Sequence, residues 1–336
     1  MDNVIDFKHK MAAHCETGTL TALFNYAGLN ITEPLVFGIA NGIFFGYLET
    51  DTFPFPTFIV RSRPGQIRKN ITKRLGIKLK EYKFKKDIEK GEAVLDELIQ
   101  NNIPTAAQVD FFYMDYMPEW QRVHINVHFI IISGLKEGKY VVSDSYFPRI
   151  AELSKESMRK ARWAGGHMAP KGFLFYPEKV PIDVDLKKPI IKGIKTACRN
   201  MIGLPVPFIG VKGIYKFADK VKEWPKIARD TEHLSHEIMK INILLEDQGT
   251  GGAGFRFMYA SFLQQASEIL ANNDLADMSK RMMQIGDEWR NISYFAAKIG
   301  KNRDIGPDKL EELSQLIRKR GDEEKTFFSD LKKIVK

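Results

Sequence analysis

A cysteine near the start of the chain lies where a nucleophile would be expected. Cys15 lies two residues ahead of residues 17–26, whose apolar spacing predicts a helix. A thiol at a helix N-terminus faces the positive end of the helix dipole, which favours the thiolate, the form of cysteine that attacks electrophiles. The alternative is an inert, buried cysteine.

A predicted hairpin supplies two partners for this thiol. Residues 126–135 and 140–144 alternate as strands do and flank a charged turn containing Gly. His128 opens the first strand and Asp144 ends the second. If the loop is centred on Glu137, the two side chains are diagonal neighbours on one face of the hairpin. A loop of even length would reverse this parity unless a bulge restored it.

A thiol, an imidazole and a carboxylate in this order are typical of cysteine hydrolases. In that arrangement His128 takes the thiol proton, and Asp144 orients the imidazole and stabilises its charged form. Two other interpretations stay open, because His128 could be a satisfied core histidine and Asp144 could cap a turn.

The elements around these residues predict an α+β first part. Helices are expected over residues 17–26, from Thr32-Glu33-Pro34 onward, over 66–75 and over 87–100; strands are expected over 77–84, 106–113 and 171–176 in addition to the hairpin. The glycines at positions 38, 42 and 46 indicate close packing of a buried segment or a bend in the chain. After residue 176 a proline-rich stretch precedes almost continuous helical periodicity. We therefore predict an α+β domain, residues 1–180, followed by an all-α helical domain, residues 190–336.

Composition narrows the class of protein. The 336 residues are 44% hydrophobic and 28% charged, which excludes a disordered or fibrous chain. The first six residues lack the basic and apolar regions of a signal peptide, and the longest uncharged run, residues 34–48, is shorter than the roughly 20 residues that span a membrane. The two cysteines fit a reducing cytoplasm, and Cys198 is expected to be a packed thiol. We expect a cytoplasmic protein without a membrane segment.

The formal charge of +9 is uneven, because residues 187–336 carry a surplus of seven basic residues. A basic surface favours an acidic partner. We do not expect a nucleic-acid partner. His124 and His128 are about 13 Å apart if they share a strand, and His233 and His236 lack carboxylates at suitable spacing, so no metal site is expected.

Several motifs resemble one known family. They are His14–Leu20, Glu33–Gly38 with Gly42, Val109–Tyr113 through Tyr116-Met117-Pro118, His128-Phe129, Val142-Ser143-Asp144, and Gly249–Gly252 with Phe255-Arg256, Tyr259 and Phe262-Leu263. In this order they resemble the butirosin-biosynthesis H protein (BtrH) family along almost the whole chain.

The resemblance implies a papain-like cysteine-peptidase fold used for acyl transfer, followed by a helical domain. In the butirosin protein an acyl group moves from a carrier-protein thioester to an amine of an aminoglycoside. Carried over, Cys15 is the nucleophile, His128 the general base and Asp144 the orienting acid. No cofactor is expected, because phosphopantetheine arrives on an acidic acyl carrier protein, and the acceptor is a small amine.

Two rival functions remain. A cysteine peptidase or thioesterase would use the same triad with water as the acceptor, and an inactive binding module would not need the thiol at all. The oligomeric state stays open, with a homodimer as one option.

Other residues are candidates for binding. His9 lies six residues before Cys15, where papain-like enzymes place an oxyanion donor. Asp110 could hold the substrate amine, or it could be a buried carboxylate bonded to backbone. Gly251 and Gly252 could form an anion-binding nest with Arg256 one turn into the next helix, or a plain helix–helix turn.

Overall fold

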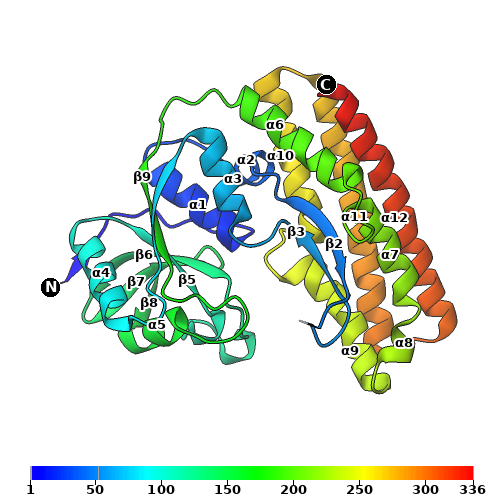
Figure 1. Cartoon of the computed structure of the whole chain (residues 1–336), viewed down its shortest axis with the longest axis horizontal. Coiled ribbons are helices and arrows are strands. Elements are labelled where there is room, and N and C mark those ends of the chain that lie inside the picture. Colours follow the sequence, from blue (N-terminus) through cyan, green and yellow to red (C-terminus); the bar gives the residue numbers. More distant parts are fainter. Residues whose placement is uncertain (1, 52, 336) are drawn as a thin grey trace. The chain divides into compact units, whose positions relative to one another are not determined.

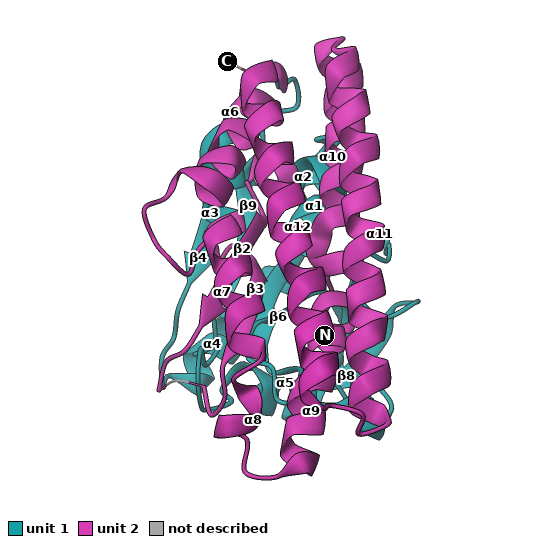
Figure 2. Cartoon of the chain, turned by 90° about the vertical axis from the view of Figure 1, so that its right-hand side faces the viewer, with its two compact units in different colours: residues 1–36, 68–184 teal, residues 37–67, 185–336 magenta. Residues whose placement is uncertain are grey.

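The computed structural model describes residues 2–51 and 53–335. The chain divides into two compact units (Figures 1 and 2). Unit 1 comprises residues 1–36 and 68–184, and unit 2 comprises residues 37–67 and 185–336. Each unit is described by itself.

Unit 1 is built on a seven-stranded antiparallel sheet with the order β4-β9-β5-β6-β7-β8, and β1 also pairs with β6. The strands are β1 (Asn3–Val4), β4 (Lys78–Tyr82), β5 (Thr105–Val109), β6 (His128–Lys136), β7 (Lys139–Ser143), β8 (Ala151–Ser154) and β9 (Leu174–Lys179). The helices are α1 (Cys15–Tyr26), α3 (Gln66–Leu75, in this unit from Arg68), α4 (Ile88–Gln100) and α5 (Lys155–Arg162). Short 3₁₀ turns cover Phe111–Tyr113 and Glu119–Gln121.

The strand predicted over residues 106–113 therefore ends early. Asp110 accepts a hydrogen bond from the backbone N–H of Phe112 and starts a 3₁₀ turn. A side chain that caps its own turn competes with the strand ladder, which is why β5 stops at Val109.

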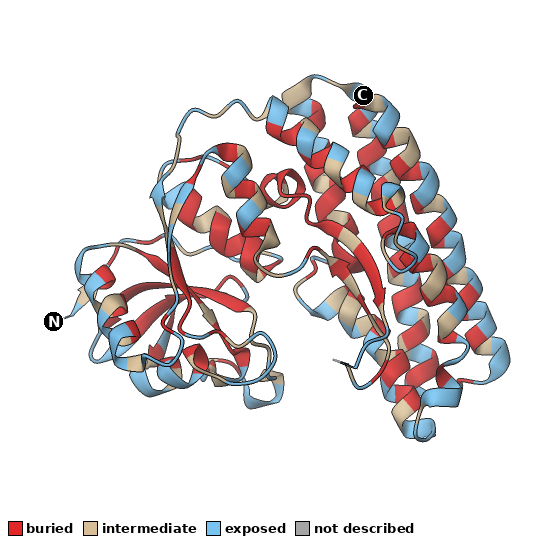
Figure 3. Ribbon diagram, in the orientation of Figure 1, coloured by how far each residue is buried: buried red, intermediate tan, exposed pale blue. Residues whose placement is uncertain are grey.

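One cluster of the core of unit 1 lies on one face of this sheet. Ile130, Ile132 and Val142 are buried there together with apolar residues of α4 and α5. Helix α1 packs on β6 and β9. Figure 3 shows the central strands as almost entirely buried. Strand β6 is thus held by neighbours along its length, and its first residue is His128.

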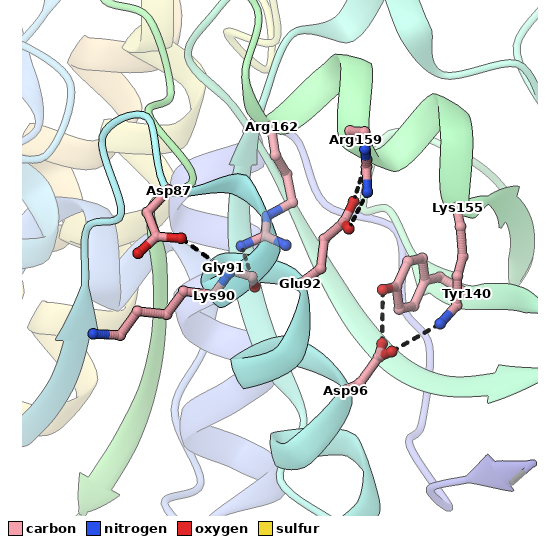
Figure 4. A network of polar contacts seen from close by, with 9 residues as sticks. All are labelled: Asp87, Lys90, Gly91, Glu92, Asp96, Tyr140, Lys155, Arg159 and Arg162. Atoms are coloured by element: carbon pink, nitrogen blue, oxygen red, sulfur yellow. Dashed lines mark hydrogen bonds and ion pairs between the residues drawn. The ribbon is translucent and has the colours of Figure 1, made fainter.

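Polar contacts join α4 to this sheet and to α5 (Figure 4). Asp96 of α4 accepts hydrogen bonds from the hydroxyl of Tyr140 and from Lys155 Nζ, both at 2.7 Å. Arg159 binds Glu92 through two N–H groups, at 2.7 and 2.5 Å. Tyr140 belongs to β7, the strand that ends just before Asp144. The network therefore holds this strand in place.

The β6–β7 hairpin has a two-residue loop. Glu137 and Gly138 have φ values of 49° and 75°, as a type I′ turn requires. This even loop would shift the pairing that we predicted by one residue. A bulge between Ile132 and Gly134 restores it, so that Ile131 pairs with Ser143. Because of this bulge, His128 and Asp144 lie on the same face of the hairpin, as predicted.

Unit 2 is mainly helical. It contains α6 (Lys187–Cys198), α7 (Val211–Val221), α8 (Trp224–Ile227), α9 (Thr231–Asn242), α10 (Arg256–Leu270), α11 (Asn273–Lys301) and α12 (Pro307–Ile334), and a hairpin of β2 (Ile43–Leu48) and β3 (Thr57–Arg61). Helix α2 (Glu33–Ile39) runs from unit 1 into unit 2. The fold class that we predicted, α+β followed by a helical region, is confirmed.

Residues 37–67 group with the helices, whereas the sequence suggested a single domain over residues 1–180. Phe45 of β2 stacks on Phe217 and Trp289, and Trp224 Nε1 donates to the Tyr47 hydroxyl at 3.0 Å. The apolar face of this hairpin therefore finds its buried partners in the helical unit.

The predicted close packing at the spaced glycines is confirmed. A Cβ at Gly38 would lie 2.0 Å from the ring of Phe262, and one at Gly42 would lie 2.3 Å from that of Phe37. Among the described residues, no helix is both long and apolar enough to cross a membrane.

We predict that Gly38→Ala lowers the free energy of unfolding by about 1–3 kcal/mol, because the added methyl group overpacks a filled core. Gly306→Ala is the control, since a Cβ there meets nothing within 4 Å. Urea unfolding of both variants measures the difference; equal stabilities would contradict the packing described for Gly38.

Candidate active site

Helix α1 begins at Cys15, so the thiol lies at its N-terminus. His14 is the N-cap: its backbone is extended, and its side chain accepts from the backbone N–H of Thr17 at 3.4 Å. Glu16 adds a negative charge to the first turn, which suits the dipole. The Cys15 thiol is directed at the carbonyl of Val127 at 3.8 Å, next to His128.

The structure brings the three predicted catalytic residues together within unit 1. His128 Nε2 lies 2.8 Å from Asp144 Oδ2, and the Cys15 side chain is hydrogen-bonded to His128. Because Nε2 is used by Asp144, the ring has Nδ1 left for the thiol. His128 is 7% exposed and Asp144 is fully buried.

Burial and charge oppose each other at this pair. Burial lowers the pKa of His128, but the charge and hydrogen bond of Asp144, helped by Cys15, prevail and raise that pKa to about 10. Burial likewise raises the pKa of Asp144, yet His128 and the hydrogen bonds to Asp144 hold that pKa below its usual value. At neutral pH the pair is therefore an imidazolium and a carboxylate, and the imidazolium lies next to Cys15.

Tyr116 completes the surroundings of Asp144. Its hydroxyl donates to Asp144 Oδ2 at 2.8 Å, and the backbone N–H of Tyr146 donates to Oδ1 at 2.9 Å. Burial, then the charge of Asp144, raises the pKa of Tyr116 well above 10, so the phenol stays a donor. Both carboxylate oxygens are thus fixed, and with them the plane of the His128 ring.

Glu33 fixes the backbone that precedes the nucleophile. Its carboxylate accepts from the backbone N–H groups of Ala13 and His14, both at 2.9 Å, and from the Thr17 hydroxyl at 2.7 Å. Burial raises the pKa of Glu33 despite these bonds. Glu33 is therefore a positioning residue for Cys15.

The sequence analysis gave no role to Tyr116 or Glu33. Both lie inside motifs that carry the resemblance to the BtrH family, and that was the only signal available. Neither has a periodicity or a spacing that connects it with the thiol.

His9 does not fit the role of an oxyanion donor. Its Nδ1 lies 2.8 Å from Ser143 Oγ, and its Nε2 lies 3.0 Å from the carbonyl of Phe147. With Nε2–H donated to that carbonyl and Nδ1 accepting from the Ser143 hydroxyl, no N–H is left for an oxyanion. His9 instead braces the turn around Asp144.

Asp110 does not offer a free carboxylate to a substrate amine. It accepts from the backbone N–H groups of Phe112 at 3.2 Å and Ile125 at 3.0 Å, and it contacts His124 Nδ1 at 2.7 Å. The structure thus shows the other alternative, a buried carboxylate bonded to backbone, with an exposed histidine added.

The predicted anion-binding nest at Gly251 and Gly252 is already satisfied from within the chain. The backbone N–H of Gly252 donates to Thr250 Oγ1 at 3.0 Å, and that of Ala253 donates to Glu246 Oε1 at 3.1 Å. A carboxylate of the protein itself therefore lies where a bound anion was expected.

Arg256 has a structural role too, and the predicted anion site is wrong. Its side chain is fully buried and binds both oxygens of Glu324, at 2.9 and 3.1 Å, as well as the carbonyl of Gly254. Trp289 Nε1 also donates to Glu324, at 2.7 Å. The arginine that seemed available to a ligand holds helices α10, α11 and α12 together.

Cys198 is buried in α6, and burial raises the pKa of its thiol to about 12, so it is poorly suited to attack. Within the described part of the chain, no three His, Cys, Asp or Glu side chains are grouped as metal ligands would be.

Comparison with known proteins places the chain in a family. Residues 156–331, just over half of the chain, match the model described as "Domain of unknown function (DUF4872)", and residues 14–145 match "Butirosin biosynthesis protein H, N-terminal". The chain belongs to this BtrH-like, DUF4872-containing family. The matched N-terminal region spans Cys15, His128 and Asp144.

Among solved structures, the BtrH-like chain is weakly similar to a protein from Bacillus anthracis that is proposed to be a C39-like peptidase. The likeness covers 54% of this chain and all of that one, at 15% sequence identity and a TM-score of 0.36. No curated protein sequence matches the chain. The papain-like character is carried by the chain's own geometry: a cysteine at a helix N-terminus faces a histidine at the start of an antiparallel strand.

The raised pKa of His128 makes a prediction about stability. A histidine whose pKa is about 10 when folded, against 6.5 normally, stabilises the fold fully below about pH 6.5, and this contribution is lost as the pH rises through about 10. We expect the difference in unfolding free energy between wild type and His128→Gln to shrink between pH 7 and pH 10.5. Denaturant titrations at both pH values test this; a constant difference would contradict it.

Glu33 makes a prediction about reactivity. Glu33→Gln should slow alkylation of Cys15 by iodoacetamide roughly tenfold, because one of the two oxygens that accept from the backbone next to the nucleophile is replaced by an amide NH₂ group, which cannot accept. Glu119→Gln, at an exposed carboxylate in the same unit, is the control and should react as wild type does. Mass spectrometry measures the alkylation rates. Equal rates for the two variants would show that Glu33 does not position the thiol.

Proposed function

We propose that the chain is a cysteine-dependent acyltransferase that moves an acyl group from a carrier-protein thioester onto a small-molecule amine, in the biosynthesis of an antibiotic-like product. The observation that carries the proposal is the buried His128, held between Asp144 and the Cys15 thiol. The match to the butirosin protein H model supports transfer to an amine in particular.

The first half of the reaction is transfer of the acyl group to the enzyme. The Cys15 thiolate attacks the thioester carbonyl, a new C–S bond forms, and the phosphopantetheine sulfur leaves and takes a proton from the His128 imidazolium. The backbone N–H of Cys15, at the open end of α1, supplies one donor for the oxyanion. One thioester replaces another, so this step needs no resident cofactor and no ATP.

The second half forms the amide. The amine attacks the acyl-Cys15 carbonyl, neutral His128 accepts the proton that the amine loses, and the Cys15 thiolate leaves. Protonated His128 and the Cys15 thiolate then form the starting ion pair again. An amide is more stable than a thioester, so this step draws the whole transfer forward.

A cysteine peptidase or thioesterase is the main alternative, because water can replace the amine in the second half. The same three residues would serve both reactions, so the acceptor alone separates them. An inactive binding module is the other alternative, and it is disfavoured by a thiol hydrogen-bonded to a charged imidazole.

The test is incubation with acetyl-pantetheine, followed by intact mass. We expect wild type and Cys198→Ala to gain one acetyl group, and Cys15→Ala and His128→Ala to gain none or to label at least about 100-fold more slowly. An aminoglycoside should then discharge the acyl-enzyme as an amide. Amine-independent release of acetate would favour the thioesterase, and absence of labelling at Cys15 would overturn the proposal.

A further inference from the structure

A groove of about 590 Å³ runs along α1 within unit 1, and this volume is typical of sites for small molecules. Gly18, Ala22 and Asn25 line the groove, and their spacing puts them on one side of the helix. Leu20 and Leu23, on the opposite side of the helix, are buried. The groove therefore follows the less buried side of α1.

One end of the groove borders the nucleophile. Gly18 lies one helical turn after Cys15, and a Cβ at Gly18 would be 2.4 Å from that of Ala12, which also lines the groove. Glu33, another lining residue, accepts hydrogen bonds from the backbone N–H groups of the two residues that precede Cys15. A molecule bound in the groove would thus end about 5 Å from Cys15, which is one turn of the helix.

The walls of the groove are fixed by the chain itself. The Asn25 side chain accepts from the backbone N–H of Ile31 and donates to the Ile31 carbonyl, both at 2.9 Å, so the loop before α2 is joined to α1. On the other side, the backbone N–H of Ala12 donates to the carbonyl of Ser145 at 3.0 Å, and His9 is held by the two contacts described above. The groove is therefore formed without a ligand.

The lining of the groove is largely apolar. Phe7 and Pro34 contribute to it, together with Met11 and Tyr26, whose side chains are about half exposed. The ring centres of Phe7 and Tyr26 lie 5.4 Å apart. Tyr26 is eight residues beyond Gly18, so these two rings mark the far end of the groove, about 12 Å further along α1.

Two lysines without ion pairs line the same groove. Lys8 and Lys10 are exposed, and among the described residues neither forms an ion pair with a carboxylate. Lys8 directly follows Phe7 and therefore lies toward the far end.

Glu33 adds little negative charge to the groove, although it is the one carboxylate among the described lining residues. Its oxygens accept three hydrogen bonds from the chain. Burial raises the pKa of Glu33, while the charge of Lys10 opposes the rise. The groove therefore favours an anion and disfavours a cationic amine.

These features match the chemistry of a phosphopantetheine thioester. This arm is a narrow chain with a dimethyl group and two amides, and it carries a phosphate at one end and the thioester sulfur at the other. Apolar walls suit the chain. Asn30, whose side-chain amide has no hydrogen-bond partner among the described residues, can bond an amide of the arm. The lysines suit the phosphate, because hydrogen bonds between opposite charges are strong.

We propose that this groove binds the phosphopantetheine arm of the thioester donor, with the phosphate at Lys8 and Lys10 and the sulfur directed toward Cys15. The inference rests on the proposed function. An acyl chain alone would leave the lysines unused, and an aminoglycoside, which is cationic, would be repelled by them.

Recognition of the phosphate is tested with two thioesters. The rate at which acetyl-phosphopantetheine acetylates Cys15 is divided by the rate with acetyl-pantetheine, both measured by intact mass at low salt. We expect this ratio to be about ten or more in wild type and to fall at least about fivefold in Lys8→Gln/Lys10→Gln. The control, Lys78→Gln/Lys80→Gln, removes the same charge at two exposed lysines of β4 that do not line the groove, and it should keep the ratio.

A second variant fills the groove. Ala22→Phe adds a ring on the groove side of α1, so acetylation by acetyl-phosphopantetheine should slow at least about tenfold relative to alkylation by iodoacetamide, a reagent too small to need the groove. An unchanged ratio of these two rates would contradict the proposal. Thermal unfolding verifies that all variants are folded.

The other outcomes separate the inference from the proposed function. Equal rates with the two thioesters in wild type would overturn the inference and leave the proposed function in place. Equal loss of the ratio in both lysine variants would show that only net charge matters, which also overturns the inference. If neither thioester labelled Cys15, the proposed function itself would fail. Coenzyme A carries the same arm, so faster acetylation by acetyl-coenzyme A than by an acetylated carrier protein would contradict the carrier as the donor.

Discussion

The site depends on one interaction, the buried contact between the imidazole of His128 and the carboxylate of Asp144. Removing a charged pair from water is costly, and the cost is offset only when both charges are paired and the remaining donors and acceptors are satisfied. Here Tyr116 and the Tyr146 backbone satisfy Asp144, and Cys15 is the remaining partner of His128. The same pairing keeps a cationic imidazole beside the Cys15 side chain.

The surrounding fold serves to keep this contact in one geometry. β6 is a central strand and presents His128 at its first residue, while a bulge before Gly134 compensates for an even loop and keeps Asp144 on the matching face. Glu33 holds the chain ahead of the nucleophile, and His9 braces the turn after β7. A site assembled from distant segments thus owes its precision to polar contacts that lie outside the three reacting side chains.

Unit 2 shows how a pattern suited to ligand binding can have a structural use. Glycines followed by an arginine favour an anion site by residue type. In the folded chain Glu246 occupies the glycine turn, and Arg256 is fully buried against Glu324. Residue types specify which interactions can form, but the partner that is nearest after folding decides which of them do.

The sequence by itself determined most elements, the two-part architecture and the three residues of the candidate triad, because helix starts, strand alternation and turn residues are local signals within a few positions. It left open whether His128 and Asp144 share a face, because that depends on the loop length and on a bulge, and the bulge between Ile132 and Gly134 is a feature of the folded sheet. Only the tertiary structure decided that residues 37–67 pack with the helices, that Glu33 and Tyr116 support the site, and that His9, Asp110 and Arg256 are already bonded within the chain. These contacts join segments far apart in sequence, and their partners are selected by how the layers pack, which no local pattern records.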